Sequence, residues 1–325
     1  MASLEDWSLP AALQPRPGDY AYDLDRALLS MVSLRAQVPP DAFTADILGT
    51  ERVGNGVLIS EDGVVLTIGY LVTEAEEVWL TTGLGRVVPG HVLAYDQVTG
   101  FGLVQALARL DLPALPLGAS GAAGLGEPVV VAGAGGRARS VAARVVARQE
   151  FAGYWEYVLD EAIFTAPAHP HWGGTALIGP GGERLGIGSL QLEQAAPGGD
   201  ARSLNMIVPV DLLHPIHDDL VRFGRPNRPA RPWLGLYATE AENRVVVMGL
   251  AAGGPADGAG LEAGDIVLAV AGRAVGTLAS FFRRVWAIGP AGVEIPLTVH
   301  RAGRTFGLSI PSADRSRYLK APRLH

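Results

Sequence analysis

A mainly β fold is predicted by three features of the sequence. The chain holds 42 glycines and 23 prolines among 325 residues, which implies many turns. Its apolar residues fall into short runs bounded by turn-forming residues, a pattern typical of strands rather than of long helices. A proline-rich segment without apolar periodicity, residues 225–232, is expected to be a stiff linker. We therefore expect two β domains, one on each side of this linker.

The composition excludes several classes of function. With 48% hydrophobic and 18% charged residues the chain is typical of a globular protein with a sizeable core. The net charge of -7 offers no electrostatic footprint for nucleic acid, and no window approaches the roughly 18 uninterrupted apolar residues that a membrane span needs. The absence of cysteine excludes disulfides, thiolate catalysis and cysteine-ligated zinc. We expect no cofactor and neither a nucleic-acid nor a membrane partner.

The N-terminal segment does not have the pattern of a signal peptide. Residues 1–19 hold Glu5, Asp6 and Asp19 against a single Arg16, without a basic region followed by an apolar one. This pattern predicts a cytoplasmic protein. A short helix is expected within residues 20–29, with Asp23 as its N-cap.

The elements expected before the linker are mostly strands. Asp62-Gly63 marks a tight hairpin, because both residues tolerate a positive φ. A short helix is expected over residues 214–224. The expected strands are Met31 to Val38, Arg52 to Ile59, Val64 to Thr67, Val78 to Thr81, Val129 to Gly133, Val141 to Gln149, Trp155 to Phe164, Leu185 to Leu190 and Asn205 to Val210.

Strands resume beyond the linker, with two helices between them. Val245 to Gly249 and Ile266 to Val270 are expected strands. Pro255 is suited to open a short helix that Gly260 ends. Thr277 is a natural N-cap for a helix to Ile288, whose apolar face comprises Leu278, Phe281, Phe282, Val285 and Ile288.

A loop rich in proline and glycine, residues 166–174, is where a reactive centre is expected. It reads Ala166-Pro167-Ala168-His169-Pro170-His171-Trp172-Gly173-Gly174 and precedes another glycine-rich turn at 181–188. Trp172-Gly173-Gly174 stands where trypsin-like proteases carry their serine followed by two glycines. The stretch resembles the nucleophile loop of HtrA-type serine proteases, which join a chymotrypsin-like double β-barrel to a PDZ domain. Tryptophan takes the place of the serine.

The same resemblance extends to the other two catalytic positions. Residues 53–67 are similar to the first barrel hairpin of the family, which leads into the catalytic histidine, and Tyr70 falls at the position of that histidine. Residues 94–104 resemble the strand that carries the catalytic aspartate, and Gly100 takes its place. Asp96 matches a residue of the adjacent turn, not the catalytic acid.

These replacements predict that the reactive centre is inactive. Serine attack on an amide needs a nucleophile, a base, a group that orients the base, and amide donors for the oxyanion. Trp172 has no nucleophilic atom, Tyr70 with an ordinary pKa near ~10 is a poor base, and Gly100 has no side chain. In the family the residue two before the nucleophile donates its N–H to the oxyanion, and Pro170 has none.

Two alternatives stay open at this loop. A shifted alignment would let Thr175, Ser189 or His91 rebuild a serine-type endopeptidase site nearby. His169 and His171 could also ligate a metal, although a tetrahedral site needs three or four converging ligands. The other interpretation of these histidines is structural, with their rings hydrogen-bonded to the loop backbone. We expect no metal.

The segment after the linker resembles a PDZ domain. Residues 253–266 match its core motif, and Trp233-Leu234-Gly235-Leu236 resembles the loop that receives a peptide's terminal carboxylate with successive backbone N–H groups. The resemblance implies an apolar pocket beside this loop, and the residues expected to bind peptide are Trp233, Leu234, Gly235, Leu236, Phe282 and Val285. Several of these residues, Val285 above all, could instead belong to the core.

The resulting prediction is a non-catalytic HtrA-like pseudoprotease that binds protein C-termini or extended peptides as an adaptor, scaffold or holdase. The alternatives are an endopeptidase with a rearranged active site and a metal-binding pseudoprotease. Tyr20 and Tyr22 lie where relatives use aromatic residues to trimerise, so a homo-oligomer is possible, although ordinary surface aromatics are the other interpretation. The expected organisation is an arm at 1–30, the double barrel at 31–224, the linker at 225–232, the PDZ domain at 233–311 and a basic tail at 312–325.

Overall fold

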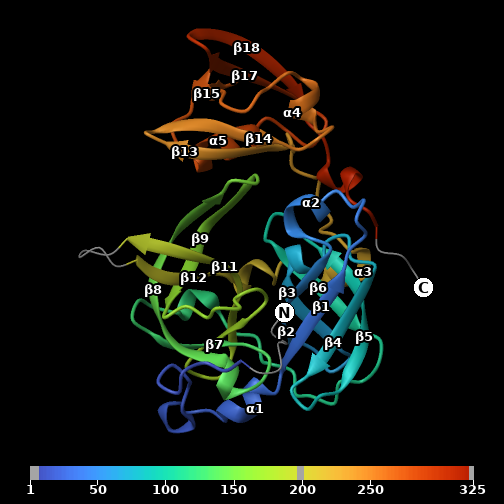
Figure 1. Cartoon of the computed structure of the whole chain (residues 1–325), viewed down its shortest axis with the longest axis vertical. Helices are drawn as coiled ribbons and strands as arrows, with labels where there is room; N and C mark the ends of the chain where they lie inside the picture. Colours follow the sequence, from blue (N-terminus) through green and yellow to red (C-terminus); the bar gives the residue numbers. More distant parts are fainter. Residues whose placement is uncertain (1–6, 196–200, 322–325) are drawn as a thin grey trace. The chain divides into compact units, whose positions relative to one another are not determined.

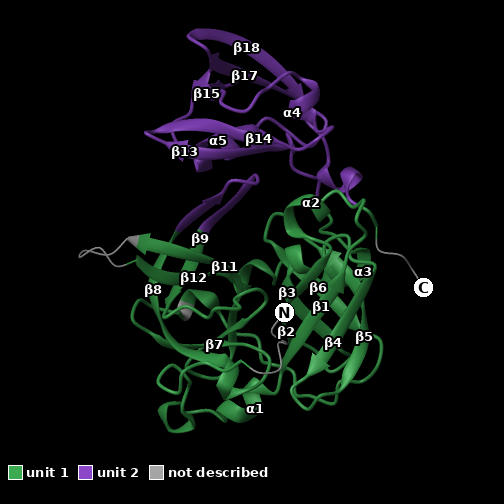
Figure 2. Ribbon diagram, viewed as in Figure 1, with its two compact units in different colours: residues 1–149, 161–227, 320–325 green, residues 150–160, 228–319 purple. Residues whose placement is uncertain are grey.

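The computed structural model describes residues 7–195 and 201–321, and within them the chain is mostly β, as predicted (Figure 1). Contacts divide the chain into unit 1, residues 1–149, 161–227 and 320–325, and unit 2, residues 150–160 and 228–319 (Figure 2). Glu5, Asp6 and Arg323, on which parts of the N-terminal and tail predictions rest, lie outside the described residues.

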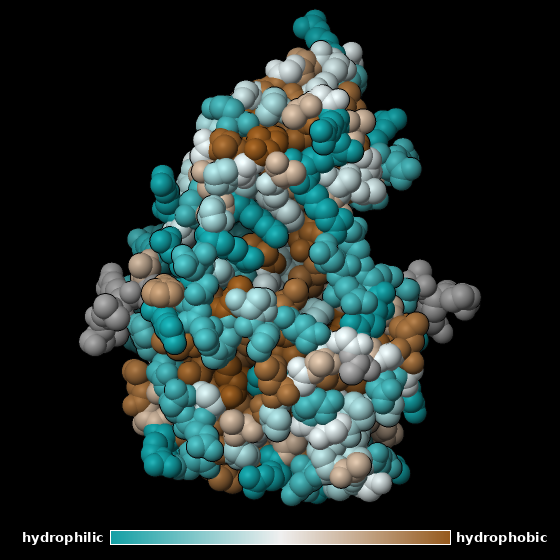
Figure 3. All heavy atoms as spheres, turned by 180° about the vertical axis from the view of Figure 1, so that it is seen from behind, coloured by the Kyte–Doolittle hydropathy of each residue, from teal (hydrophilic) through white to brown (hydrophobic). Residues whose placement is uncertain are grey.

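The surface of the described residues mixes polar and apolar side chains. On the face drawn in Figure 3, brown apolar side chains are interspersed with teal hydrophilic ones. Large exposed apolar residues include Leu84, Leu107, Leu125 and Phe223. Within the described part of the chain, every helix is too short or too polar to cross a bilayer.

The first half of unit 1 is a closed six-stranded barrel in the order β1-β2-β3-β6-β5-β4. Alternate residues such as Val32, Leu34 and Leu80 point inward and are fully buried, which is the period-two pattern of a barrel wall. Gly63 has a φ of 94° and closes the predicted hairpin between the second and third strands. The strands are β1 (Met31–Gln37), β2 (Glu51–Leu58), β3 (Val64–Ile68), β4 (Glu77–Thr82), β5 (Val87–Tyr95) and β6 (Phe101–Ala106).

A second closed barrel follows in the order β10-β11-β12-β9-β8-β7, so the predicted double barrel is confirmed. Its core includes Val131, Val141, Ile163 and Leu177, all fully buried. The strands are β7 (Pro128–Ala132), β8 (Ser140–Gly153), β9 (Tyr157–Ala166), β10 (Ala176–Ile178), β11 (Arg184–Ala195) and β12 (Ala201–Pro209).

The β8–β9 hairpin differs from the prediction in two ways. The strand expected at Trp155 begins only at Tyr157, because Trp155 and Glu156 form the turn, with Glu156 at a φ of 60°. The tip of the hairpin, residues 150–160, also groups with unit 2, whereas the sequence placed it inside a domain of residues 31–224.

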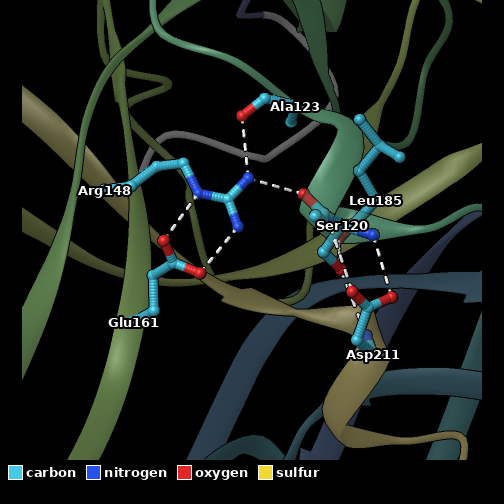
Figure 4. A network of polar contacts seen from close by, with 7 residues as sticks. Ser120, Ala123, Arg148, Glu161, Leu185 and Asp211 are labelled. Carbon is cyan, nitrogen blue, oxygen red and sulfur yellow. Dashed lines mark hydrogen bonds and ion pairs between the residues drawn. The ribbon is translucent and has the colours of Figure 1, made fainter.

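The crossover between the barrels is anchored by a polar network in unit 1 (Figure 4). The Asp211 carboxylate accepts from the Ser120 amide at 2.8 Å, and the Ser120 hydroxyl donates to the Leu185 carbonyl at 2.7 Å. Arg148 of β8 donates to the Ser120 carbonyl at 2.6 Å and pairs with Glu161 of β9 at 2.8 Å. Segments far apart in sequence are thereby held at one point.

The N-terminal arm is packed on unit 1 rather than detached from it. The predicted helix is shorter than expected, α1 (Leu24–Leu28), and the Asp23 side chain caps it by accepting from the Arg26 amide at 3.0 Å. Tyr20 and Tyr22 are half-buried, with their rings 5.5 Å apart, and Tyr22 lies against Gly182 of the same unit. The other helices of unit 1 are α2 (Ala45–Leu48) and α3 (His217–Phe223), shorter than the predicted 214–224.

Unit 2 is a sheet in the order β13-β14-β15-β17-β18, with β16 paired to β15. As predicted, Thr277 caps the helix after β16, and it forms a capping box with Ser280. The elements are β13 (Leu236–Ala241), β14 (Arg244–Leu250), α4 (Pro255–Gly258), β15 (Ile266–Val270), β16 (Arg273–Ala274), α5 (Leu278–Trp286), β17 (Glu294–Arg301) and β18 (Arg304–Pro311).

The tail after β18 packs on unit 2 through Ala313 and Tyr318. Ala313 pairs with Trp233 through a β-bridge, and the Tyr318 ring lies 4.8 Å from the Trp233 ring. A 3-10 turn over Arg315–Tyr318 connects these contacts.

Candidate functional site

The loop between β9 and β10 is fixed by two buried asparagines. Asn205 of β12 accepts from the His169 amide at 2.6 Å and donates to the His169 carbonyl at 3.2 Å. Asn55 of β2 donates to the carbonyls of His171 at 3.0 Å and Gly173 at 3.2 Å. The loop that carries Trp172 is therefore held by one buried asparagine from each barrel.

Tyr70 and Trp172, at the positions that the resemblance assigns to histidine and serine, meet in the structure. Tyr70 lies in the 3-10 turn Gly69–Leu71 directly after β3, and its hydroxyl donates to the Ser189 carbonyl at 2.9 Å. The Trp172 side chain hydrogen-bonds to the same hydroxyl, and an indole N–H can only donate. Burial raises the pKa of Tyr70 well above its ordinary value, so the phenol stays protonated.

Gly100 is also next to this pair, but it supplies only backbone. Its carbonyl accepts from the Gly69 amide at 2.7 Å, and its φ of 84° suits glycine. Asp96 closes the same turn by accepting from the Thr99 amide at 2.9 Å and from the Thr99 hydroxyl at 2.8 Å. The nearby carboxylate is thus committed to the turn and does not orient Tyr70.

Two amides near Pro170, those of His171 and Thr175, are used within the loop. Pro170 has no N–H, and the amide of His171 donates to the His169 ring at 3.0 Å. The Thr175 amide and hydroxyl both donate to the Trp172 carbonyl, at 3.1 and 2.8 Å. An oxyanion would have to compete with these contacts for its donors.

Among the described residues, no side-chain hydrogen bond joins the residues considered for a rebuilt hydrolase site. Thr175 is fully buried and bonded to Trp172, while Ser189 is buried on β11 and offers its carbonyl to Tyr70. His91 lies on β5 in the first barrel, opposite Gln105. A hydroxyl–imidazole hydrogen bond does occur at 3.1 Å between Thr305 and His300, but it is a solvent-exposed contact between β17 and β18 of unit 2.

His169 is a structural residue, as the second interpretation predicted. Its Nε2 bonds to the Arg139 carbonyl at 2.9 Å, and its Nδ1 accepts from the His171 amide, so both ring nitrogens are engaged. Burial lowers its pKa to about 4, which keeps the ring neutral. The ring of His171 lies 4.4 Å from that of Trp7 in the N-terminal arm. Within residues 7–195 and 201–321 no group of three or more potential ligands gathers to hold a metal.

A second candidate site is the loop Trp233-Leu234-Gly235-Leu236 in unit 2, which enters β13. Gly235 has a φ of 74°, which turns consecutive amides toward one point. The amides of Leu234, Gly235 and Leu236 all donate to the Glu156 carboxylate, with N–O distances of 2.7 to 3.2 Å. In this structure the backbone N–H groups of the loop therefore hold the side-chain carboxylate of Glu156.

The side chains predicted to line the pocket beside this loop are buried. Leu234, Leu236, Phe282 and Val285 are at most 1% exposed and belong to the core cluster of unit 2. Trp233 is 6% exposed, and its backbone pairs with Ala313. In this structure they are core residues, which is the alternative that the sequence left open for several of them.

Two family models match the chain in agreement with these two sites. The trypsin-like peptidase domain matches residues 54–187, and the PDZ domain matches residues 232–311. The chain therefore joins a trypsin-like peptidase domain to a PDZ domain, and we call it HtrA-like for its similarity to that family.

Curated relatives of the HtrA-like chain are named serine endoproteases. It is 25% identical over 275 residues to the probable periplasmic serine endoprotease DegP-like of Halomonas elongata, which covers 81% of the chain and 56% of the relative. It is 23% identical over 290 residues to the serine endoprotease DegS of Escherichia coli, covering 81% of the chain and 77% of the relative. The chain thus spans little more than half of the Halomonas protein.

Solved structures agree in fold. The HtrA-type protease AlgW with a decapeptide matches with a TM-score of 0.54 at 19% identity, covering 92% of this chain and 98% of that one. The same protease with a tripeptide gives a TM-score of 0.53 at 20% identity. At these identities the likeness concerns the fold of the HtrA-like chain alone.

Three functional contacts of the HtrA-like chain were missed from sequence. Asn55 and Asn205 act on loops more than 30 residues away, and only the presence of an amide within an otherwise apolar strand could have indicated them. Glu156 was placed in a strand and was not recognised as an anion at the carboxylate loop. A charged residue flanked by three aromatic residues and a glycine at a hairpin tip was the available signal.

Proposed function

We propose that the HtrA-like chain is a peptide-binding protein that does not hydrolyse what it binds. It takes protein C-termini or extended tails through its PDZ domain and serves as an adaptor, scaffold or holdase. The observation that carries this proposal is the convergence of three consecutive amides, those of Leu234, Gly235 and Leu236, on a carboxylate. A backbone site of this kind needs no charged side chain to bind the end of a peptide.

The absence of hydrolysis is proposed from the contents of the peptidase domain. A protonated tyrosine and a tryptophan that hydrogen-bond each other take the places of the base and the nucleophile. Pro170 takes the place of an oxyanion donor. Loss of a single such donor costs about 10²- to 10³-fold in rate, and loss of the triad costs far more.

Incubation with unfolded casein and a serine-directed phosphonate probe tests this half of the proposal. We expect no cleavage and no labelling for the wild type, and the same for Trp172→Ala. Casein cleavage that co-purifies with wild type and disappears in Trp172→Ala would show that this loop is catalytic.

A serine-type endopeptidase is the second candidate, because the curated relatives are named serine endoproteases. Specific phosphonate labelling, followed by peptide mapping of the labelled residue, distinguishes the two. A label on Ser189 or Thr175 would favour the endopeptidase. The metal-binding alternative finds no support, since both ring nitrogens of His169 are bonded to backbone.

Binding itself is tested with peptides that differ only at their last group. A peptide with a free C-terminal carboxylate and an apolar last residue should bind with micromolar affinity, which is usual for this mode. Its C-terminal amide should bind at least about tenfold more weakly, because it brings no anion to the three amides. Equal affinities would contradict a carboxylate-binding loop.

A further inference from the structure

The PDZ carboxylate loop is already occupied by part of the same chain. Residues 150–160, the tip of the β8–β9 hairpin, form part of unit 2 (purple in Figure 2). The two strands of this hairpin continue along the chain into the second barrel. The tip and the PDZ domain touch at three independent places.

The first contact is made by the Glu156 carboxylate. Its Oε1 accepts from the amides of Leu234 at 3.1 Å, Gly235 at 2.7 Å and Leu236 at 3.2 Å, and its Oε2 accepts from Leu234 at 3.1 Å. The side chain is buried with 4% of the residue exposed. These are the contacts expected for the terminal carboxylate of a bound peptide.

The second contact is a main-chain hydrogen bond to the edge of the sheet. The Ala238 amide of β13 donates to the Tyr154 carbonyl at 3.0 Å. β13 is the end strand in the order of the unit 2 sheet, so its outer edge is where a peptide strand would add. Tyr154 lies two residues before Glu156. Its carbonyl bonds to the edge strand while the Glu156 carboxylate bonds to the loop, as the backbone and the terminal carboxylate of a C-terminal peptide would.

The third contact fixes the two arms of the hairpin to unit 2. Val158 is 8% exposed and joins the apolar cluster that contains Leu236 and Phe282. Arg283 of α5 forms ion pairs with Glu150 and, at 2.5 Å, with Asp160, one on each arm. The hairpin thus engages the helix as well as the edge strand, the two elements between which a peptide would lie.

The backbone of the tip is consistent with a dedicated role. Glu156 has a φ of 60°, a region that residues other than glycine, asparagine and aspartate seldom adopt. A buried carboxylate is also costly unless several donors satisfy it. Here the donors are the three amides of the PDZ loop, so the tip conformation and the loop support each other.

We propose that Tyr154-Trp155-Glu156 is an internal ligand of the PDZ domain, and that a C-terminal peptide binds only by displacing it. This inference rests on the proposed function, since it names the competitor at the same site. In this arrangement the side-chain carboxylate of Glu156 takes the place of a peptide's terminal carboxylate.

An internal ligand lowers the apparent affinity for every external one. Only the fraction of molecules with the tip released can bind peptide, and the apparent dissociation constant rises by the inverse of that fraction. Because the tip is covalently attached, it competes at a high effective concentration. Removing the Glu156 side chain should therefore tighten peptide binding by about tenfold or more.

The test uses the full chain and a fluorescein-labelled hexapeptide, Phe-Ala-Gly-Tyr-Trp-Val, with a free carboxylate. This peptide copies residues 151–155 and ends in an apolar residue. Glu156→Gly removes the carboxylate at a position whose φ suits glycine. Glu242→Gly is the matched control, because Glu242 is an exposed residue of unit 2 with a similar φ of 50°. Affinity is measured by fluorescence anisotropy, together with hydrogen exchange of the amides at 234–236.

We expect Glu156→Gly to bind the peptide about tenfold tighter than wild type, with faster amide exchange at 234–236, and Glu242→Gly to behave as wild type. Wild type and Glu156→Gly could bind the free-acid peptide with equal affinity while neither binds the amidated peptide. That result would overturn the internal ligand and leave the proposed function standing. Faster exchange in Glu156→Gly without binding of the free acid or its amide would show that the loop is occupied by the tip but is not a peptide site. Unchanged exchange in Glu156→Gly would overturn the internal ligand directly.

Discussion

The two glycine-containing loops of this chain use their backbone N–H groups in opposite ways. Around Trp172 the amides of His171, Gly174 and Thr175 all donate to groups of the same domain, and Pro170 has none to offer. At Leu234, Gly235 and Leu236 three amides point together at one carboxylate. The comparison shows that backbone amides can hold an anion without any catalytic side chain. Amides that already donate to the protein itself, as around Trp172, are not free to do so.

Asn55→Ala should have the largest effect, on the first of these loops. The asparagine side chain donates to the His171 and Gly173 carbonyls and accepts from the buried Ala134 amide at 2.9 Å. Its removal leaves the Ala134 amide and the His171 carbonyl without this partner, whereas Gly173 keeps its bond from the Asn55 backbone amide. We expect the free energy of unfolding to fall by about 2 to 4 kcal/mol. Urea denaturation followed by tryptophan fluorescence measures it.

The control for Asn55→Ala is Asn227→Ala, because the Asn227 side chain is exposed. We expect that variant to lie within about 0.5 kcal/mol of wild type. A similar loss of stability in both variants would mean that Asn55 is not a specific support of the loop.

Gly235→Ala should have the next largest effect, on the second loop. The position has a φ of 74°, and an added Cβ would lie 3.0 Å from the Trp233 ring. The three amides should then no longer point at one position. We expect peptide affinity to fall by about tenfold or more and the free energy of unfolding to fall by about 1 kcal/mol. Isothermal titration with the free-acid peptide gives the first value and thermal denaturation the second.

Gly258→Ala serves as the matched change, since Gly258 has open space around its Cβ position. It should bind peptide as wild type does. Unaltered binding in Gly235→Ala would mean that the glycine does not set the direction of the amides.

The pH dependence of peptide binding sharpens the comparison further. Burial raises the pKa of Glu156 to about 7, against the hydrogen bonds from the loop amides and the charge of Arg315, which lower it. Tyr237 and Tyr154 are the other titratable groups near it. The docked tip therefore takes up a proton more readily than a released tip, whose carboxyl has an ordinary pKa near 4.5.

It follows that docking of the tip is favoured as the pH falls below about 7 and weakens above it. Peptide affinity of the wild type should rise by up to about tenfold between pH 6 and pH 8. Glu156→Gln, which cannot titrate, should show no such rise. If peptide affinity changed with pH in the same way in wild type and Glu156→Gln, competition by the Glu156 carboxylate would not explain the pH dependence.

Trp172→Ser should have the smallest effect on activity. It restores a hydroxyl where the resemblance expects one, yet Tyr70 stays protonated and Pro170 still lacks an N–H. We expect casein to stay intact in an overnight digestion followed by gel electrophoresis. Measurable turnover would show that a serine alone is sufficient in this loop.

Much of the fold was predictable because it depends on local signals. Short apolar runs between turn-forming residues indicated the strands, Asp62-Gly63 the hairpin, and Thr277 the start of α5. The positions of Tyr70 and Trp172 followed from the similarity of short motifs to a known family, and the structure brings the two side chains together.

The contacts that were missed depend on distant parts of the chain. Asn55 reaches residues more than 100 positions later, and no periodicity encodes such a pairing. The partners of Glu156 follow it by 78 to 80 positions, so nothing nearby in the sequence indicated that a residue expected in a strand would be a buried anion at a turn. The packing of the Tyr318 ring against Trp233 likewise joins residues 85 positions apart.

Mass spectrometry of a bound peptide tests the central claim most directly. The free-acid hexapeptide is incubated with the full chain, the complex is isolated, and the peptide is released and weighed. We predict that it is recovered bound and intact after hours, and that its C-terminal amide is not recovered. Recovery of cleaved fragments that a serine-directed phosphonate prevents would contradict the account.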